Sequence, residues 1–317
     1  MKKVSLLIPA YNEEETLGLL YNELNRVMDE IPGYEFEILF VNDGSGDNTL
    51  AILRNLRKMD SRVNYISFSR NFGKETAMAA GFDYVSGDAV VILDADLQDP
   101  PELIKEMLLY WEEGYDDVYA KRRTREGETW FKKYTSSAFY KLLQTMTKIP
   151  IQEDTGDFRL LDRRAVESLR KLREKQRYTK GMFGWIGFNK KEILFDRKPR
   201  AAGETKWNYL KLFNLALEGV TSFTTFPLRI STILGSVVSI FSIVYMFVVL
   251  IKSLIWKDPV KGYPSMMVII LFLGGVQLIS LGIIGEYIGR IFNETKYRPL
   301  YIIDEHNNEK IEDGGRL

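Results

Sequence analysis

The chain of 317 residues contains no cysteine and only one histidine, His306. Without cysteine it has no disulfide, no zinc-thiolate site and no cysteine nucleophile. A single histidine in a polar stretch near the C-terminal end also makes a Ser-His-Asp triad or a histidine metal cluster a poor expectation. Any chemistry must therefore depend on carboxylates, hydroxyls, lysines and arginines.

The chain also lacks a net charge. Lysine plus arginine and aspartate plus glutamate both number 43. A nucleic-acid partner usually requires a basic surface, so we expect none. The first residues, MKKVSLLIPAYNEEE, do not form a signal peptide, because their apolar run is short and acids follow at once. We therefore expect the N-terminal part to stay in the cytoplasm.

Two long runs, residues 230–251 and 264–285, carry no charged side chain. At about 1.5 Å per helical residue, each could cross a hydrocarbon core of about 30 Å. We predict a hairpin of two transmembrane helices within residues 229–286, rather than two buried helices of a soluble protein. Two crossings return the chain to its starting side. The expected location is therefore the cytoplasmic membrane, multi-pass, with both termini in the cytoplasm.

The residues after the second run are polar, and we expect residues 287–317 to form a cytoplasmic tail. Its end, DEHNNEKIEDGGRL, has the composition of a disordered segment. Gly285 and Gly289 are spaced so that the spans could pack closely within or between subunits, which would allow a homo-oligomer.

Apolar strand patterns alternate with helical patterns in the N-terminal part of the chain. The runs KKVSLLIPAY, YEFEILFVN, VNYISFS and AVVILDAD predict strands, and amphipathic segments separate them. This alternation is typical of βαβ units, so we predict an α/β domain with a largely parallel sheet. Residues 103–200 are less regular, and there we expect helices and an antiparallel strand at KKEILFD.

Ligands of open parallel sheets bind beyond the carboxyl ends of the strands. Many polar residues of this chain fall at such ends, which favours one shared site. They are Tyr11, Asn12, Asp43, Ser69, Arg70, Asp94 and Asp96.

Asp94 and Asp96 are the most informative of these residues. Two carboxylates so close repel each other unless a cation offsets their charge. Mg²⁺ and Mn²⁺ take oxygen ligands, and Mg²⁺ is commonly held by one or two carboxylates together with substrate phosphates. The alternative is a pair of turn or helix-capping acids, which we prefer for Asp99. There is no G-x-G-x-x-G after a strand and no P-loop, so dinucleotide and ATP sites are poorly supported.

Six motifs in order, IPAYNEEETL, VNDGSGDNT, SRNFGKETAMAAGFD, DADLQDPPE, TGDFRLLDR and RAAGETKW, resemble those of the family 2 glycosyltransferases with the GT-A fold. More narrowly, they are similar to the polyprenyl-phosphate glycosyltransferases, which include dolichol-phosphate mannose synthases and bactoprenol glucosyltransferases. The resemblance spans roughly residues 3–225, and the two apolar runs match the bactoprenol branch. It implies a Rossmann-like GT-A domain over residues 1–203. Residues 204–228 would form juxtamembrane amphipathic helices, the alternative being ordinary packing against the domain.

The resemblance implies a nucleotide-sugar donor lying over the strand ends, with Mg²⁺ or Mn²⁺ as cofactor. Asp96 would hold the metal beside Asp94, which faces the nucleotide, and Gln98 would lie nearby as a catalytic residue. Arg200 and Lys206 would close over the diphosphate, with Thr205 in place of the usual serine of that motif. The nucleoside pocket would be lined by Pro9, Tyr11, Glu13 and Asp43.

The acceptor implied by the resemblance is a polyprenyl phosphate, with Arg122, Lys133 and Ser137 as its phosphate contacts. The alternative for these cations is a solvated basic face near anionic lipid. Asp157 stands where related transferases place a catalytic base. A phosphate monoester has its second pKa near 6 and is largely deprotonated at neutral pH, so it needs little help from a base. Asp157 could instead have a positioning role.

We therefore expect inverting, metal-dependent transfer of a sugar, with UDP-glucose as the favoured donor, to undecaprenyl phosphate. A processive polysaccharide synthase would usually show Q-x-x-R-W and more spans, whereas Gln176 and Arg177 are adjacent here. A membrane-anchored scaffold that binds a nucleotide sugar without turnover would be expected to have lost some of the acids and cations named above.

Overall fold

The structure is a computed structural model that describes residues 1–123, 155–196, 226–256 and 262–311. The chain divides into two compact units. One comprises residues 1–212 and 298–317, and the other comprises residues 213–297. The final segment therefore belongs with the N-terminal part of the chain, although an apolar region separates them in sequence.

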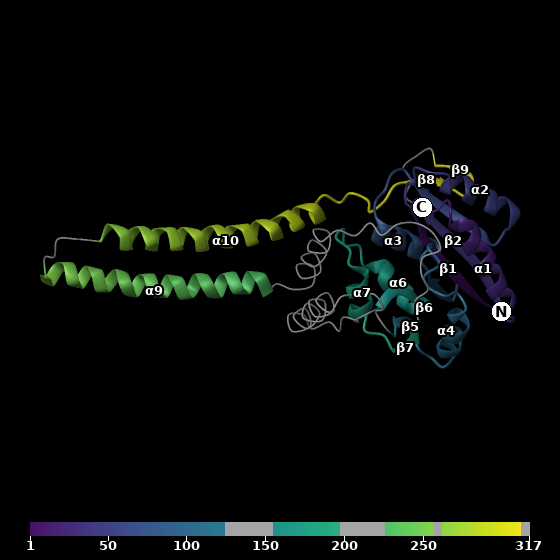
Figure 1. Cartoon of the computed structure of the whole chain (residues 1–317), viewed down its shortest axis with the longest axis horizontal. Helices are drawn as coiled ribbons and strands as arrows, with labels where there is room; N and C mark the ends of the chain where they lie inside the picture. Colours follow the sequence, from purple (N-terminus) through teal and green to yellow (C-terminus); the bar gives the residue numbers. More distant parts are fainter. Residues whose placement is uncertain (124–154, 197–225, 257–261, 312–317) are drawn as a thin grey trace. The chain divides into compact units, whose positions relative to one another are not determined.

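The first unit is built on a nine-stranded sheet in the order β7-β5-β6-β4-β1-β2-β3-β8-β9. Figure 1 shows this sheet with helices packed around it. Four strands at its centre are parallel and were predicted from the sequence, as were the helices that connect them. The α/β prediction is confirmed for this half of the sheet. The elements are β1 (Lys2–Ala10), α1 (Leu17–Asp29), β2 (Tyr34–Asn42), α2 (Thr49–Met59), β3 (Val63–Phe68), α3 (Lys74–Tyr84) and β4 (Ala89–Ile92).

Strand direction changes beyond β4. There, β6 runs antiparallel to both β4 and β5, whereas β7 runs parallel to β5. The prediction of an antiparallel strand at KKEILFD is therefore wrong, because this segment is β7 and pairs parallel with β5. Alternating side chains show which face of a strand is buried, but they do not identify its partner. The elements are α4 (Leu103–Glu112), β5 (Asp117–Arg122), β6 (Thr155–Asp162), α6 (Arg163–Lys171), α7 (Thr179–Trp185) and β7 (Lys190–Phe195).

Helix α4 also begins later than the sequence suggested. Its N-cap is Glu102, so Asp99 is not the capping residue. Asp99 is instead buried in the turn that leads to the helix.

Helix α3 packs closely on the sheet because its buried face consists largely of small residues. A Cβ at Gly81 would lie 2.1 Å from Cδ1 of Leu7 on β1, so a larger residue there would push the helix off the strand. The other buried residues of this face include Ala77, Ala79 and Ala80. This close contact positions the first turn of α3, which carries polar side chains.

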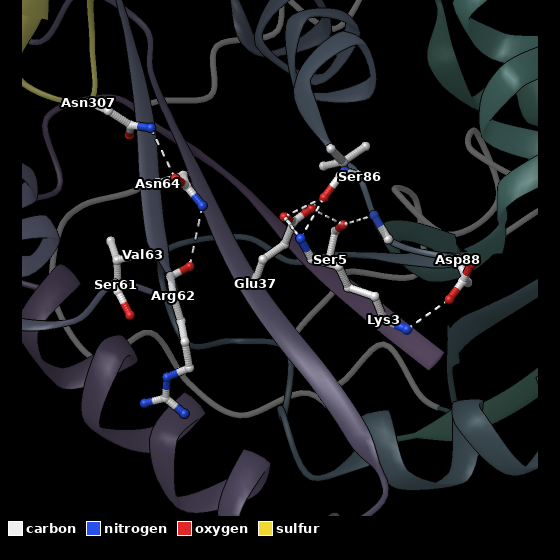
Figure 2. A network of polar contacts seen from close by, with 12 residues as sticks. Lys3, Ser5, Glu37, Ser61, Arg62, Val63, Asn64, Ser86, Asp88 and Asn307 are labelled. Atoms are coloured by element: carbon white, nitrogen blue, oxygen red, sulfur yellow. Dashed lines mark hydrogen bonds and ion pairs between the residues drawn. The ribbon is translucent and has the colours of Figure 1, made fainter. Parts of the chain in front are cut away.

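A buried polar network holds the other end of α3 (Figure 2). Glu37 on β2 accepts hydrogen bonds from the backbone N–H and the hydroxyl of Ser86, both at 2.7 Å, and from the hydroxyl of Ser5. Lys3 forms an ion pair with Glu37 at 2.7 Å. Burial opposes ionisation of Glu37, but Lys3 and these donors hold its pKa below the usual range. The turn between α3 and β4 is thereby fixed to β1 and β2.

The segment expected to be disordered is ordered over most of its length, which corrects that prediction. Strand β8 (Ile303–His306) pairs antiparallel with β3, and β9 (Glu309–Lys310) pairs with β8. Glu305 is buried and forms an ion pair with Arg54. The polar composition of this segment suggested disorder. The sequence does not show that Arg54, 251 residues away, offsets the charge of Glu305.

Tyr301 anchors the chain just before β8. Its ring stacks on Phe68 with centroids 5.2 Å apart, and its hydroxyl donates to Asp83 of α3 at 2.7 Å. The final segment therefore contacts both the sheet edge and α3.

The second unit contains two long helices, α9 (Phe226–Trp256) and α10 (Tyr263–Thr295), which lie side by side and run in opposite directions (Figure 1). The two predicted apolar runs fall within these helices. Among the described residues, Val268–Thr295 is the one stretch long and apolar enough to cross a membrane, and Ile230–Tyr245 is a shorter apolar segment. Large apolar side chains point outward from both helices, for example Phe241 and Leu278.

The docking of the final segment can be tested with Tyr301→Ala. The loss of the stacked ring and of the bond to Asp83 should lower the free energy of unfolding of the first unit by about 2 kcal/mol. Thermal unfolding of the detergent-purified chain would show a lower Tm. Tyr297→Ala is the matched control, because Tyr297 is 91% exposed. Equal Tm values for the two variants would contradict the docked arrangement.

Candidate active site

A cleft of about 240 Å³ opens where β1, β2 and β4 end. Of the seven polar residues predicted to share a site at the strand ends, Tyr11, Asp43, Asp94 and Asp96 line this cleft, whereas Asn12, Ser69 and Arg70 do not. Six predicted site residues line it: Pro9, Tyr11, Glu13, Asp43, Asp94 and Asp96. The other lining residues are Ala10, Asn71, Gly73, Lys74, Ala77 and Ala95.

The wall after β1 combines an exposed ring with a fixed loop. Tyr11 is 45% exposed, so its ring is accessible to a planar ligand. Glu13 accepts a hydrogen bond from the hydroxyl of Thr16 at 2.7 Å, and its backbone N–H donates to Thr49 at 2.9 Å. Glu13 thus joins the first loop to the start of α2.

Asp43, at the end of β2, holds the loop that precedes α3. Its two carboxylate oxygens accept the backbone N–H groups of Phe72 and Gly73, at 2.7 and 2.9 Å. Burial raises the pKa of Asp43, and these bonds offset the shift only in part. The next residue, Gly44, has φ +61°, and a Cβ there would lie 2.2 Å from the backbone of Arg70. Asp43 and Gly44 therefore hold the loop after β2 in close contact with the loop before α3.

Lys74, the first residue of α3, connects the two sides of the site. Its ammonium lies 2.6 Å from a carboxylate oxygen of Asp94 and 2.5 Å from one of Asp157. Although desolvation opposes the charge, these two carboxylates raise the pKa of Lys74, which is therefore protonated at neutral pH. One cation thus pairs with an acid just after β4 and with an acid of β6.

The strand pairing explains why these acids meet. In the antiparallel register of β4 and β6, Ile92 lies opposite Arg159. Continuing this register by two residues brings Asp94 opposite Asp157. Because β6 runs against its neighbour, its first residues lie at the edge of the sheet where β4 ends.

Asp157 is a buried anion among cations. Burial opposes its ionisation, but the nearby charges of Lys74 and Lys180 hold its pKa at about 2. One oxygen pairs with Lys74, and the other, Oδ1, has no hydrogen-bond partner among the described residues. Asp157 is therefore charged at every physiological pH, and its Oδ1 is a buried oxygen without a hydrogen-bond partner among the described residues.

Glu75 and Lys180 lie behind Asp157. Glu75 accepts hydrogen bonds from the backbone N–H of Thr179, at 2.9 Å, and from its hydroxyl. This fastens α7 to α3. The next residue, Lys180, donates to the backbone carbonyl of Thr155 at 3.0 Å. Burial lowers the pKa of Lys180, and the Asp157 carboxylate opposes that shift.

The acids after β4 suit a divalent cation of the Mg²⁺ or Mn²⁺ type. Among the described residues there is no group of three or more metal-binding side chains. Asp94 and Asp96 would thus supply two carboxylates, leaving the remaining positions for phosphate oxygens and water, as is common for Mg²⁺. The backbone N–H of Gln98 donates to Asp96 at 3.2 Å, and the side chain of Gln98 is buried. Leu97 between them has φ 57°, a left-handed conformation that costs energy in a leucine.

The predicted acceptor residues are described only in part. Arg122 ends β5, and its guanidinium lies 3.9 Å from the position that a Cβ on Gly156 would occupy, next to Asp157. Lys133, Ser137, Arg200 and Lys206 fall outside the described residues.

Sequence reasoning did not single out Lys74, Glu75 or Lys180. Lys74 had a usable signal, because it begins a helix just after the third predicted strand, at the same edge as the acids. Glu75 and Lys180 had none, since their importance depends on the contact between α3 and α7.

Burial and the Asp157 charge raise the pKa of Glu75 to about 7, above the ordinary value of 4.5. The folded chain thus binds this proton more tightly than the unfolded chain does. The resulting stability is complete below about pH 4.5 and is lost as the pH rises through about 7. Glu75→Gln should therefore remove a decrease in Tm between about pH 5 and pH 8. Glu113→Gln, at an exposed position, should keep that decrease. Parallel curves for the wild-type chain and Glu75→Gln would contradict the assignment.

Comparison with known proteins places these observations in a family. The family model described as glycosyl transferase family 2 matches residues 5–170, more than half of the chain. A second model, described as the GtrB C-terminal hairpin, matches residues 226–291. Among solved structures, mannosyl-3-phosphoglycerate synthase from Rubrobacter xylanophilus covers 69% of this chain and 72% of its own, with 19% identity and a TM-score of 0.47.

Curated relatives match almost the whole length. The uncharacterized glycosyltransferase sll0501 of Synechocystis sp. is 50% identical over 96% of this chain and 95% of its own. The bactoprenol glucosyl transferase of Shigella phage SfV is 47% identical over 97% of this chain and 99% of its own. The chain therefore belongs to glycosyl transferase family 2 and is a glycosyltransferase.

Proposed function

We propose that the protein transfers a sugar, with UDP-glucose as the favoured donor, to a polyprenyl phosphate such as undecaprenyl phosphate. The observation that carries this proposal is the meeting of Asp94 and Asp157 at Lys74, because it joins the cleft at the strand ends to a buried acid that has Lys180 and Arg122 nearby. The relatives named bactoprenol glucosyl transferase, 47% identical over most of both chains, support the acceptor and the sugar.

In this proposal the donor lies in the cleft. The nucleoside would lie against Pro9, Tyr11 and Glu13, near Asp43, and Asp94 and Asp96 would hold Mg²⁺ or Mn²⁺. A bound divalent cation would offset the negative charge that develops on the departing nucleoside diphosphate. Gln98 supports Asp96 through its backbone N–H. Arg200 and Lys206 would supply further cations to the diphosphate.

The acceptor phosphate approaches from the side of Asp157. Arg122 lies beside Gly156 in the described part of the chain, and Lys133 and Ser137 would complete the contacts. A phosphate oxygen then attacks the anomeric carbon while the bond to the nucleoside diphosphate breaks. This single displacement inverts the configuration of the sugar, and holding both substrates together supplies much of the acceleration.

We assign Asp157 a positioning role in this reaction. Its pKa of about 2 makes it a weak base, and its carboxylate is already paired with Lys74. The acceptor is largely a dianion at neutral pH and has no proton that must be removed. Asp157 instead orients Lys74 and the groups around the acceptor.

We further propose that α9 and α10 both cross the cytoplasmic membrane, leaving both termini in the cytoplasm. The matched hairpin model and the outward apolar side chains of both helices support this. Most of residues 204–228, for which juxtamembrane amphipathic helices were predicted, lies outside the described residues.

The transfer can be tested with the detergent-purified chain, undecaprenyl phosphate, Mg²⁺ or Mn²⁺, and a panel of radiolabelled UDP- and GDP-sugars. We expect metal-dependent appearance of label in the organic phase, greatest with UDP-glucose. Asp96→Asn should reduce transfer by about 100-fold or more, because a metal ligand is lost. Asp29→Asn, at an exposed position on α1, is the matched control. Absence of transfer from every donor by a folded chain would exclude this function in favour of a binding role.

The role of Asp157 can be tested with Asp157→Asn. We expect roughly a tenfold loss of turnover and an unchanged pH profile of kcat/KM. A general base contributes about 10²- to 10⁴-fold. A loss of that size, together with a shifted pH profile, would show that Asp157 removes a proton.

A further inference from the structure

We propose that Lys74 is the resident counter-ion of the metal site, which a divalent cation displaces from Asp94 when the nucleoside diphosphate binds. This inference rests on the proposed function, since it concerns the same donor site. Its central observation is that one ammonium contacts both Asp94, at 2.6 Å, and Asp157, at 2.5 Å.

Charge balance gives the reason for such a cation. Asp94 follows β4 by two residues and Asp157 lies on β6, and both carboxylates contact the same ammonium, while Asp96 lies two residues from Asp94. Without a cation these carboxylates would repel one another and lower the stability of the empty site. Lys74 supplies one positive charge from within the chain. A divalent cation at Asp94 would supply two, and its charge would repel the ammonium.

The side chain of Lys74 can exchange partners while its backbone stays in place. The loop before Lys74 is held by two hydrogen bonds from backbone N–H groups to Asp43. The next residue, Glu75, is held by its hydrogen bond from the backbone N–H of Thr179. The lysine side chain itself is 42% exposed and also lines the cleft. A flexible four-carbon stem therefore allows the ammonium to leave Asp94 and to reach a phosphate oxygen of the donor.

Competition of this kind links the metal to the nucleotide. On an empty site the divalent cation must replace Lys74 at Asp94, so it binds weakly. When the nucleoside diphosphate is present, its phosphate oxygens become new partners for Lys74 and additional ligands for the metal. The nucleotide should thus raise the affinity for the metal, and the metal should raise the affinity for the nucleotide by the same factor.

The test measures Mn²⁺ binding to the detergent-purified full chain by electron paramagnetic resonance of free Mn²⁺, with and without UDP. In the wild-type chain, Mn²⁺ alone should bind weakly, and UDP should strengthen its binding. Lys74→Met should bind Mn²⁺ alone about tenfold more tightly, and the gain from UDP should shrink. Lys74→Arg keeps the charge and should preserve the wild-type pattern.

Lys58→Met is the matched control, because Lys58 is exposed in the last turn of α2 and its loss changes the net charge equally. If Lys74→Met does not fold, Lys74→Gln serves as the neutral variant, since its amide can still contact the carboxylates. Equal or weaker Mn²⁺ binding by a folded neutral variant would overturn the proposal. The measurement needs no sugar transfer. The role of Lys74 can therefore fail while the transferase function holds, and the transferase function can fail while Lys74 still competes with Mn²⁺.

Discussion

The ammonium of Lys74 pairs with the carboxylate of Asp94, just after β4, and with that of Asp157 on β6, and so holds two acids of like charge close together. Other features of the site depend on this contact. Helix α3 must present its first residue between the two strands, and β6 must run antiparallel so that its first residues lie at the same edge. The reversal of one strand in an otherwise largely parallel sheet is therefore what brings Asp157 to the acids after β4.

Helix α3 is held at both ends, which explains how Lys74 keeps its position. At the cleft, Asp43 binds the amides just before the helix. At the far end, Glu37 binds Ser86 in the turn that follows it. Between them, Gly81 lets the helix approach Leu7 closely. Substitutions at Glu37 or Gly81 would thus shift α3 and move Lys74 in the cleft, although neither residue lines it.

The charge pattern of the site agrees with the proposed transfer to a phosphate. A phosphate acceptor at neutral pH needs cations and orientation more than it needs a base. The site has this character, because Asp157 is strongly acidic and is surrounded by Lys74, Lys180 and Arg122. In the proposed reaction, the carboxylates therefore hold cations and the cations hold phosphates.

The sequence by itself determined the central parallel strands, the helices between them and the gathering of Tyr11, Asp43, Asp94 and Asp96 at one edge. These features follow from local hydrophobic periodicity and from the rule that parallel strands end together. It also determined the two long apolar helices, because their composition is uniform over their length.

Only the tertiary structure decided the rest. The direction of β6 and β7, the return of β8 to β3 and the bridging position of Lys74 all depend on which distant segments pair. Glu305 shows the physical reason. Its polar surroundings in the sequence predict a disordered segment, but in the fold Arg54 and Tyr65 contact its carboxylate and it is buried. Periodicity shows which face of an element is buried, but partner choice is settled by contacts between residues far apart in the chain.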